Sequence, residues 1–234
     1  MTGRLRWLSA AFIDYISAEG RRILFDPWTR TQGNGGCTYG DDAFADTDLI
    51  LVSHDHLDHI GSAAPICKNT NALLGGPDES MKRLIREEGL APERIVNHGG
   101  GYIVGGGFEN DWIKVVSTPA HHSSNTSMAL GTIAILRDGP TLYHTGDTSI
   151  VAEMEIYGRL YPVDIMFVPV FGQCMMDYVQ AAEAVHMVKP KIAAPIHFDA
   201  NKDTEYELNR FYDLCGSKNP SVKVIKTEKD TWYD

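Results

Sequence analysis

The chain has 234 residues, 43% of them apolar, and carries 21 basic against 31 acidic side chains, a formal net charge of −10. This size and composition predict a soluble globular protein. The acidic balance argues against nucleic acid as the main partner, because phosphate binding requires a basic surface. No apolar run approaches the roughly 20 residues that span a bilayer, and the N-terminus does not resemble a signal peptide. We therefore expect a cytoplasmic protein with no membrane contact.

The first half of the chain is expected to combine short strands with two helices. Residues 28–46 are rich in Gly, Thr, Asn and Asp without periodicity, and predict a long loop, either a functional lid or a disordered excursion. The glycine triplets at 99–101 and 105–107 predict turns around a short strand over 102–104 rather than a phosphate-binding loop, because no helix or Gly-Lys-Ser/Thr follows. Apolar runs predict the remaining elements: strands over 4–8, 12–17, 22–25, 48–52 and 72–74, and helices over about 57–64 and 77–88.

The second half of the chain has the same order of predicted elements as the first half. Strands come first, and helices and strands then alternate. Its predicted strands cover 112–118, 129–136, 141–144, 164–168, 191–195 and 222–226, and its predicted helices cover 149–160, 177–188 and 204–215, the last capped by Gly216. We interpret the chain as a single domain over 1–234 with pseudo-halves of about 1–110 and 111–234. The shared order predicts an α/β sandwich with two mostly β layers inside and helices outside.

A dense group of metal-binding side chains follows the apolar run at 49–52. His54, His56 and His59 alternate there with the carboxylates Asp55 and Asp58. Imidazole and carboxylate together suit zinc, manganese, iron or cobalt. A lone His-x-His is common, but the full His-x-His-x-Asp-His motif after an apolar strand favours a metal site over a structural origin.

The other candidate ligands also come directly after predicted strands. His121 and His122 follow the strand over 112–118, Asp147 follows that over 141–144, and His197 follows that over 191–195. Open α/β folds bind ligands at the carboxyl ends of strands, so this shared placement is what one site requires. A single histidine in such a place is more often a hydrogen-bonded surface residue. Residue chemistry alone does not distinguish His121 from His122.

This series of motifs resembles the ligand set of the metallo-β-lactamase superfamily. The flanking sequence segments at 23–28, 118–124, 143–148 and 189–198 are similar to one branch of this superfamily, which contains small bacterial metal-dependent hydrolases. That branch is similar to L-ascorbate 6-phosphate lactonase and to the phospholipases that hydrolyse N-acyl phosphatidylethanolamines. The resemblance implies an αββα sandwich, in which two mixed β-sheets are flanked by helices.

The resemblance also implies two divalent metal ions, with zinc or manganese expected first and iron, cobalt or nickel left open. In this branch the word Pro-Ala-x-His selects His122 rather than His121 as the ligand. Asp26 is similar to a carboxylate that orients a ligand imidazole. The implied ligands are divided between the ions: His54, His56 and His122 for the first, Asp58, His59 and His197 for the second, and Asp147 for both.

The implied activity is hydrolysis of an ester, lactone or phosphodiester of a small molecule by a metal-bridging hydroxide. Asp58 would orient the hydroxide and carry a proton, and His121 is a candidate for protonating the leaving group. One departure from the branch lies near the start, where Leu-Ser-Ala-Ala-Phe replaces the usual Leu-Gly-His-x-x-Phe and Ala10 stands in place of the histidine. That histidine is not a metal ligand, so the metal site is expected to survive.

Two other functions compete with this one. A metal-dependent nuclease of the same fold requires a basic surface, which an acidic chain does not predict. A catalytically silent metal-binding protein would take up metal without turnover. Phe171 and the pair Met175–Met176 could form an apolar wall for a substrate, although core packing is favoured. Assembly into a homo-oligomer is left open.

Overall fold

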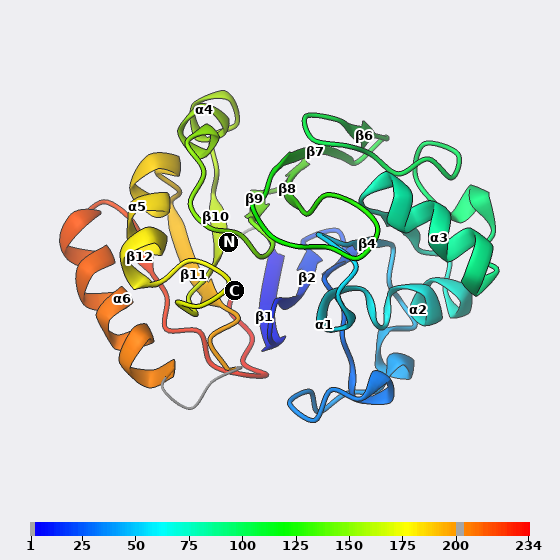
Figure 1. Ribbon diagram of the computed structural model, residues 1–234, viewed down its shortest axis with the longest axis horizontal. Helices are drawn as coiled ribbons and strands as arrows, with labels where there is room; N and C mark the ends of the chain where they lie inside the picture. The colour runs from blue at the N-terminus through cyan, green and yellow to red at the C-terminus, as the bar shows by residue number, and fades with distance from the viewer. Residues whose placement is uncertain (1–2, 200–203) are drawn as a thin grey trace.

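Two β-sheets lie face to face between two groups of helices in the computed structural model, which describes residues 3–199 and 204–234. In Figure 1, α1, α2 and α3 lie on one side of the sheets, and α4, α5 and α6 lie on the other. This architecture confirms the αββα sandwich expected from the sequence. Within the described part of the chain, no helix is both long and apolar enough to cross a membrane.

The first sheet is built from the first third of the chain. Its antiparallel part has the order β1-β2-β3, and β4 and β5 continue it in parallel with β3. Helices α1, α2 and α3 follow or interrupt these strands in sequence. The elements are β1 (Gly3–Ser9), β2 (Phe12–Ser17), β3 (Arg22–Phe25), β4 (Leu49–Leu51), β5 (Leu73–Gly75), α1 (Leu57–Ile60), α2 (Ala63–Asn69) and α3 (Asp78–Glu88).

The second sheet has the order β12-β11-β10-β9-β8-β7-β6. Pairing is antiparallel from β6 to β9 and parallel from β9 to β12, so β7, β9, β10 and β11 all run in one direction. The strands are β6 (Gly107–Glu109), β7 (Ile113–Pro119), β8 (Leu130–Leu136), β9 (Thr141–His144), β10 (Ile165–Pro169), β11 (Ile192–Ile196) and β12 (Lys223–Val224). Its helices are α4 (Glu153–Leu160), α5 (Tyr178–Val188) and α6 (Thr204–Lys218).

Most strands are buried on both faces, which explains their nearly continuous apolar runs, whereas the edge strands β6 and β12 are only partly buried. Successive side chains of a strand point to opposite faces. In β3, Phe25 therefore packs between the sheets while Leu24 packs towards the helices of the first half. In β10, Phe167 packs between the sheets while Met166 packs with the helices of the second half.

Several predicted elements differ from those observed. Residues 102–104 form no strand; Tyr102 makes only an isolated bridge with Pro77. The helix predicted from residue 149 begins at Glu153, because Ser149 pairs instead with His121. The last helix continues past Gly216 to Lys218, and its buried residues Phe211 and Cys215 pack on the core.

The predicted loop over 28–46 is ordered rather than featureless. It contains two short 3-10 helices, η1 (Arg30–Gln32) and η2 (Asp41–Phe44), and a third, η3 (Pro92–Arg94), lies further along the chain. Within the loop, Asp41 accepts hydrogen bonds from Thr29 Oγ1 and Gln32 Nε2. The Asn34 side chain donates to Ser9 Oγ at 2.6 Å, which joins the loop to the end of β1.

Candidate metal centre

The candidate ligands gather at one edge of the sandwich, where strands from both sheets end. Asp26 comes directly after β3, and the His54–His59 segment follows β4, which is parallel to β3. In the second sheet, β7, β9 and β11 run in one direction, so the segments that follow them leave the sheet at a common edge. Those segments carry His122, Asp147 and His197.

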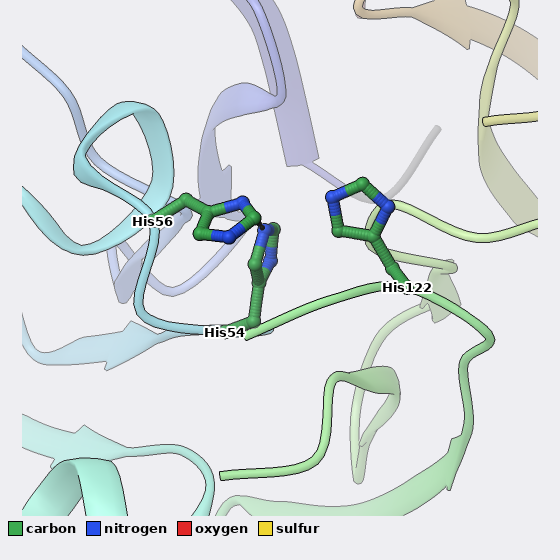
Figure 2. Close-up of side chains that lie close together, drawn as sticks. All are labelled: His54, His56 and His122. Atoms are coloured by element: carbon green, nitrogen blue, oxygen red, sulfur yellow. Dashed lines mark hydrogen bonds between the residues drawn. The ribbon is translucent and has the colours of Figure 1, made fainter. Parts of the chain in front are cut away.

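A first group of ligand atoms consists of three imidazoles. The nitrogens of His54, His56 and His122 lie within 4.8 Å of one another. His54 Nε2 is 3.0 Å from His56 Nδ1, and the His122 ring centroid is 5.0 Å from that of His54. Figure 2 shows the rings turned towards one another, with His122 arriving from a different segment of the chain.

A second group consists of Asp58, His59 and His197. His197 Nε2 is 3.3 Å and His59 Nε2 is 3.7 Å from Asp58 Oδ2. Asp58 is the most accessible of the three, with 34% of its side chain exposed, whereas both imidazoles are buried. This group is therefore open to solvent on the side of Asp58.

Asp147 lies between the two groups. Its Oδ2 atom is 3.2 Å from His59 Nε2, 3.6 Å from His197 Nε2 and 3.6 Å from His122 Nε2. It also forms a group of ligand atoms with His54 and His59. One carboxylate thus faces imidazoles of both groups.

Several buried atoms of this cluster have no hydrogen-bond partner among the residues that the structure describes. They are His59 Nε2, Asp147 Oδ1 and both ring nitrogens of His197. An unsatisfied buried polar group costs about 1–3 kcal/mol, so such atoms are expected to have a partner. A mixed nitrogen and oxygen donor set suits divalent transition metals. The residues present therefore fit divalent metal ions.

Asp26 sets the orientation of two imidazoles. Its Oδ2 atom accepts hydrogen bonds from His59 Nδ1 and Ser53 Oγ, both at 2.7 Å. Because the only Ser53 hydroxyl proton is used in this bond, Ser53 Oγ accepts from His54 Nδ1 at 3.0 Å. The Nε2 atoms of His54 and His59 therefore face the other ligands.

The His122 ring is held in the same manner from another direction. Its Nδ1 atom donates to the Cys174 carbonyl oxygen at 3.0 Å, which leaves Nε2 facing Asp147. A hydrogen bond to the second ring nitrogen of a metal-bound histidine fixes its tautomer and raises its basicity. The exposed His121 differs. Its backbone forms hydrogen bonds with Thr148 and Ser149, and its ring belongs to none of the ligand groups found in the described chain.

In the absence of metal, burial and neighbouring charges shift the pKa values of the cluster in opposite directions. Burial lowers the pKa of His59, but the carboxylates of Asp147 and Asp26 outweigh it and raise this pKa well above its ordinary value. Burial also opposes the charge on His197, whose pKa is raised by Asp147 and Asp58. Burial raises the pKa of Asp147, but His59 and His197 hold it well below its usual range. For His54, burial and the neighbouring His59 lower the pKa.

The turn between β1 and β2 supports the strand ends of the second sheet, a role that the sequence did not reveal. Ala10 O accepts from His197 N at 2.8 Å, and its N–H donates to the Asp199 carboxylate at 3.0 Å. His144 Nε2 donates to Ala11 O at 2.9 Å, while its Nδ1 accepts from the Gly146 backbone at 3.2 Å. The only sequence signal for His144 was its place directly before the Asp147 turn.

The candidate apolar wall divides into two parts. Met176 is fully buried and packs in the core of the second half, and Met175 is also buried. The Phe171 ring is half-buried, and its centroid lies 6.2 Å from that of His197. Phe171 therefore borders the cluster, while the methionines serve packing.

Comparison with known proteins identifies the family. The model of the beta-lactamase superfamily domain matches residues 21–198, which include every ligand group described above. The chain belongs to the metallo-β-lactamase superfamily. A UPF0173 metal-dependent hydrolase of Nitratidesulfovibrio vulgaris is 36% identical over 90% of this chain and 86% of its own, and one of Caldivirga maquilingensis is 34% identical over 95% and 93%.

Two solved structures have the same fold as this chain. The metallo hydrolase Igni18 of Ignicoccus hospitalis superposes with a TM-score of 0.84 at 26% identity, covering 100% of this chain and 99% of that one. A metal-dependent hydrolase of Parabacteroides distasonis superposes with a TM-score of 0.72 at 21% identity, over 97% and 93%. The shared fold therefore extends over the whole sandwich.

Proposed function

We propose that the chain is a metal-dependent hydrolase that uses two divalent ions to hydrolyse an ester, lactone or phosphodiester of a small molecule. The position of Asp147 carries this proposal. Its Oδ2 atom lies within 3.6 Å of imidazole nitrogens from both ligand groups, as a carboxylate shared by two ions requires. The names of the two relatives reported above, both metal-dependent hydrolases, support the same activity.

The first ion would be held by His54, His56 and His122, and the second by Asp58, His59 and His197. Divalent ions at such a site supply a nucleophile from water at neutral pH and polarise the substrate bond under attack. Zinc and manganese are the ions we expect first, because nitrogen and oxygen ligands suit both.

Asp58 is the residue that we propose for proton transfer. Although burial raises its pKa, the close contact with His197 and the charge of His59 outweigh this and lower the pKa, so the carboxylate is ionised at neutral pH. Its partly exposed side chain can therefore accept a proton on the solvent side of the cluster. His121, exposed beside His122, is the residue that we propose for protonating the leaving group.

The test is a hydrolysis screen of the purified protein on acyl esters, lactones and phosphodiesters, with zinc or manganese added. We expect turnover of at least one class, and loss of that turnover in His54→Ala. The matched control is His98→Asn, since His98 lies outside the ligand groups and asparagine tolerates its positive φ of 55°. Metal uptake without turnover on any class would favour the catalytically silent alternative, and a steeply salt-dependent affinity for RNA would favour the nuclease.

A further inference from the structure

Asp55 is a buried carboxylate at the centre of the metal-binding loop that belongs to none of the ligand groups in the described residues. It stands between His54 and His56, and its side chain is 0% exposed. A buried carboxylate has to be compensated by hydrogen bonds or an ion pair. The partners of Asp55 therefore show what it does.

The hydrogen-bond partners of its carboxylate come from the segment that directly follows His122, and Arg83 Nε of α3 also lies 3.6 Å from Asp55 Oδ2. Asp55 Oδ1 accepts from Ser124 Oγ and from the Asn125 backbone, both at 2.6 Å, and Oδ2 accepts from Thr126 Oγ1 at 2.5 Å. The Asn125 side chain returns a bond to Asp55 O at 2.8 Å. One residue thus joins the loop after β4 of the first sheet to the loop after β7 of the second.

These bonds connect the two segments that carry the first ligand group. His54 and His56 are the direct chain neighbours of Asp55, and His122 lies two residues before Ser124. A cavity of about 450 Å³ is lined by Asp55, Arg83 and Thr126, so open space rather than core packing borders one side of this junction. The hydrogen bonds of Asp55 therefore help to set the relative position of the two segments.

We propose that Asp55 is a positioning residue that fixes His122 against His54 and His56 and thereby sets the affinity of the first metal site without binding the ion. This inference rests on the proposed two-metal function. It also assigns Asp55 to one site only, because His59 is held by Asp26 and His197 by Ala10, neither of which contacts the junction. Loss of a group that supports metal ligands typically weakens metal binding by about 10–100-fold.

The test is a calorimetric zinc titration, which compares the affinities of the two binding events. Two reference variants assign each binding event to a ligand group. His56→Ala should remove the event of the first group, and His197→Ala should remove the event of the second group. Asp55→Asn keeps the shape of the side chain but places an amide against donors that need an acceptor. We expect it to weaken the first event by about 10–100-fold and to leave the second unchanged.

Two further variants separate positioning from general stability. Asp41→Asn alters a carboxylate that holds a loop without proposed ligands, and should change neither event. Ser124→Ala removes one bond to an intact Asp55, and should weaken the first event in a manner that is not additive with Asp55→Asn. If Asp55→Asn does not give the wild-type circular dichroism spectrum, Ser124→Ala alone tests the positioning role.

Equal weakening of both events in Asp55→Asn, or no change in either, would overturn the positioning role. Unchanged binding in Ser124→Ala would do the same. A wild-type protein that bound no zinc at all would instead refute the proposed two-metal function, so the two failures are distinct.

Discussion

His59 Nδ1 donates a hydrogen bond of 2.7 Å to Asp26 Oδ2, and this bond joins the residue after β3 to helix α1. Asp26 has a positive φ of 47°, a conformation that few residues other than glycine and asparagine adopt readily. Its carboxylate also receives the Ser53 hydroxyl, which in turn accepts from His54. One carboxylate therefore orients an imidazole in each ligand group.

Replacing Asp26 should consequently weaken both metal-binding events. In Asp26→Asn the backbone conformation is tolerated, but one carboxylate oxygen that accepts from His59 and Ser53 is exchanged for an amide group. We expect each event to weaken by about 10–100-fold in a zinc titration. Weakening of a single event, as expected for Asp55→Asn, would contradict this shared role.

His144 is expected to stabilise the fold rather than bind metal. His144→Phe keeps the stacking on Phe25 but removes both ring hydrogen bonds, leaving Ala11 O and Gly146 N without partners. Each unsatisfied group costs about 1–3 kcal/mol, so the free energy of unfolding in urea should fall by that amount or more. The exposed control His121→Phe should change it by less than about 0.5 kcal/mol. A wild-type value for His144→Phe would show that these bonds contribute little.

Metal affinity should depend on pH through the protons of His59 and His197. Their raised pKa values mean that both rings bind protons more tightly than an ordinary imidazole in the metal-free protein. A metal ion needs the unprotonated ring and must displace that proton. Apparent affinity should therefore continue to rise with pH above about 6.5, the ordinary histidine pKa, until the pH exceeds the raised values. Calorimetry in buffers of different ionisation enthalpy counts the released protons, and binding with no proton release would contradict this account.

Metal removal should lower the stability of the protein. The unpartnered atoms of His59, His197 and Asp147 gain partners only when an ion is present. A ligand at 100 times its dissociation constant stabilises the folded state by about 2.7 kcal/mol for each site. Thermal unfolding after chelation should thus occur at a lower temperature, and added zinc or manganese should restore it. An unfolding temperature unaffected by chelation would mean that the cluster holds no ion.

Part of the fold follows from local patterns that the sequence displays directly. β3 and β9 were predicted with the bounds that the structure has, because short apolar runs between turn residues are buried on both faces. The first residue of helix α4 could not be predicted from such local patterns. Its predicted first turn pairs with His121, a contact between residues distant in the chain that no local propensity encodes.

The candidate site shows the same division. The His-x-His-x-Asp-His motif after β4 identified most of the cluster, since its chemistry and its place at a strand end are both local. His121 and His122 share that place, and only the folded backbone turns the ring of His122 towards Asp147. The partners of Asp55 lie about 70 residues away, so its contacts required the structure.

Metal analysis of the purified protein after saturation and removal of free ion tests the central claim most directly. The two ligand groups and the shared Asp147 predict two divalent ions per chain in the wild type, and fewer in His54→Ala, which removes a nitrogen that faces both His56 and Asp147. A wild-type chain without bound metal, or a His54→Ala variant that retains both ions with wild-type affinity, would contradict the account.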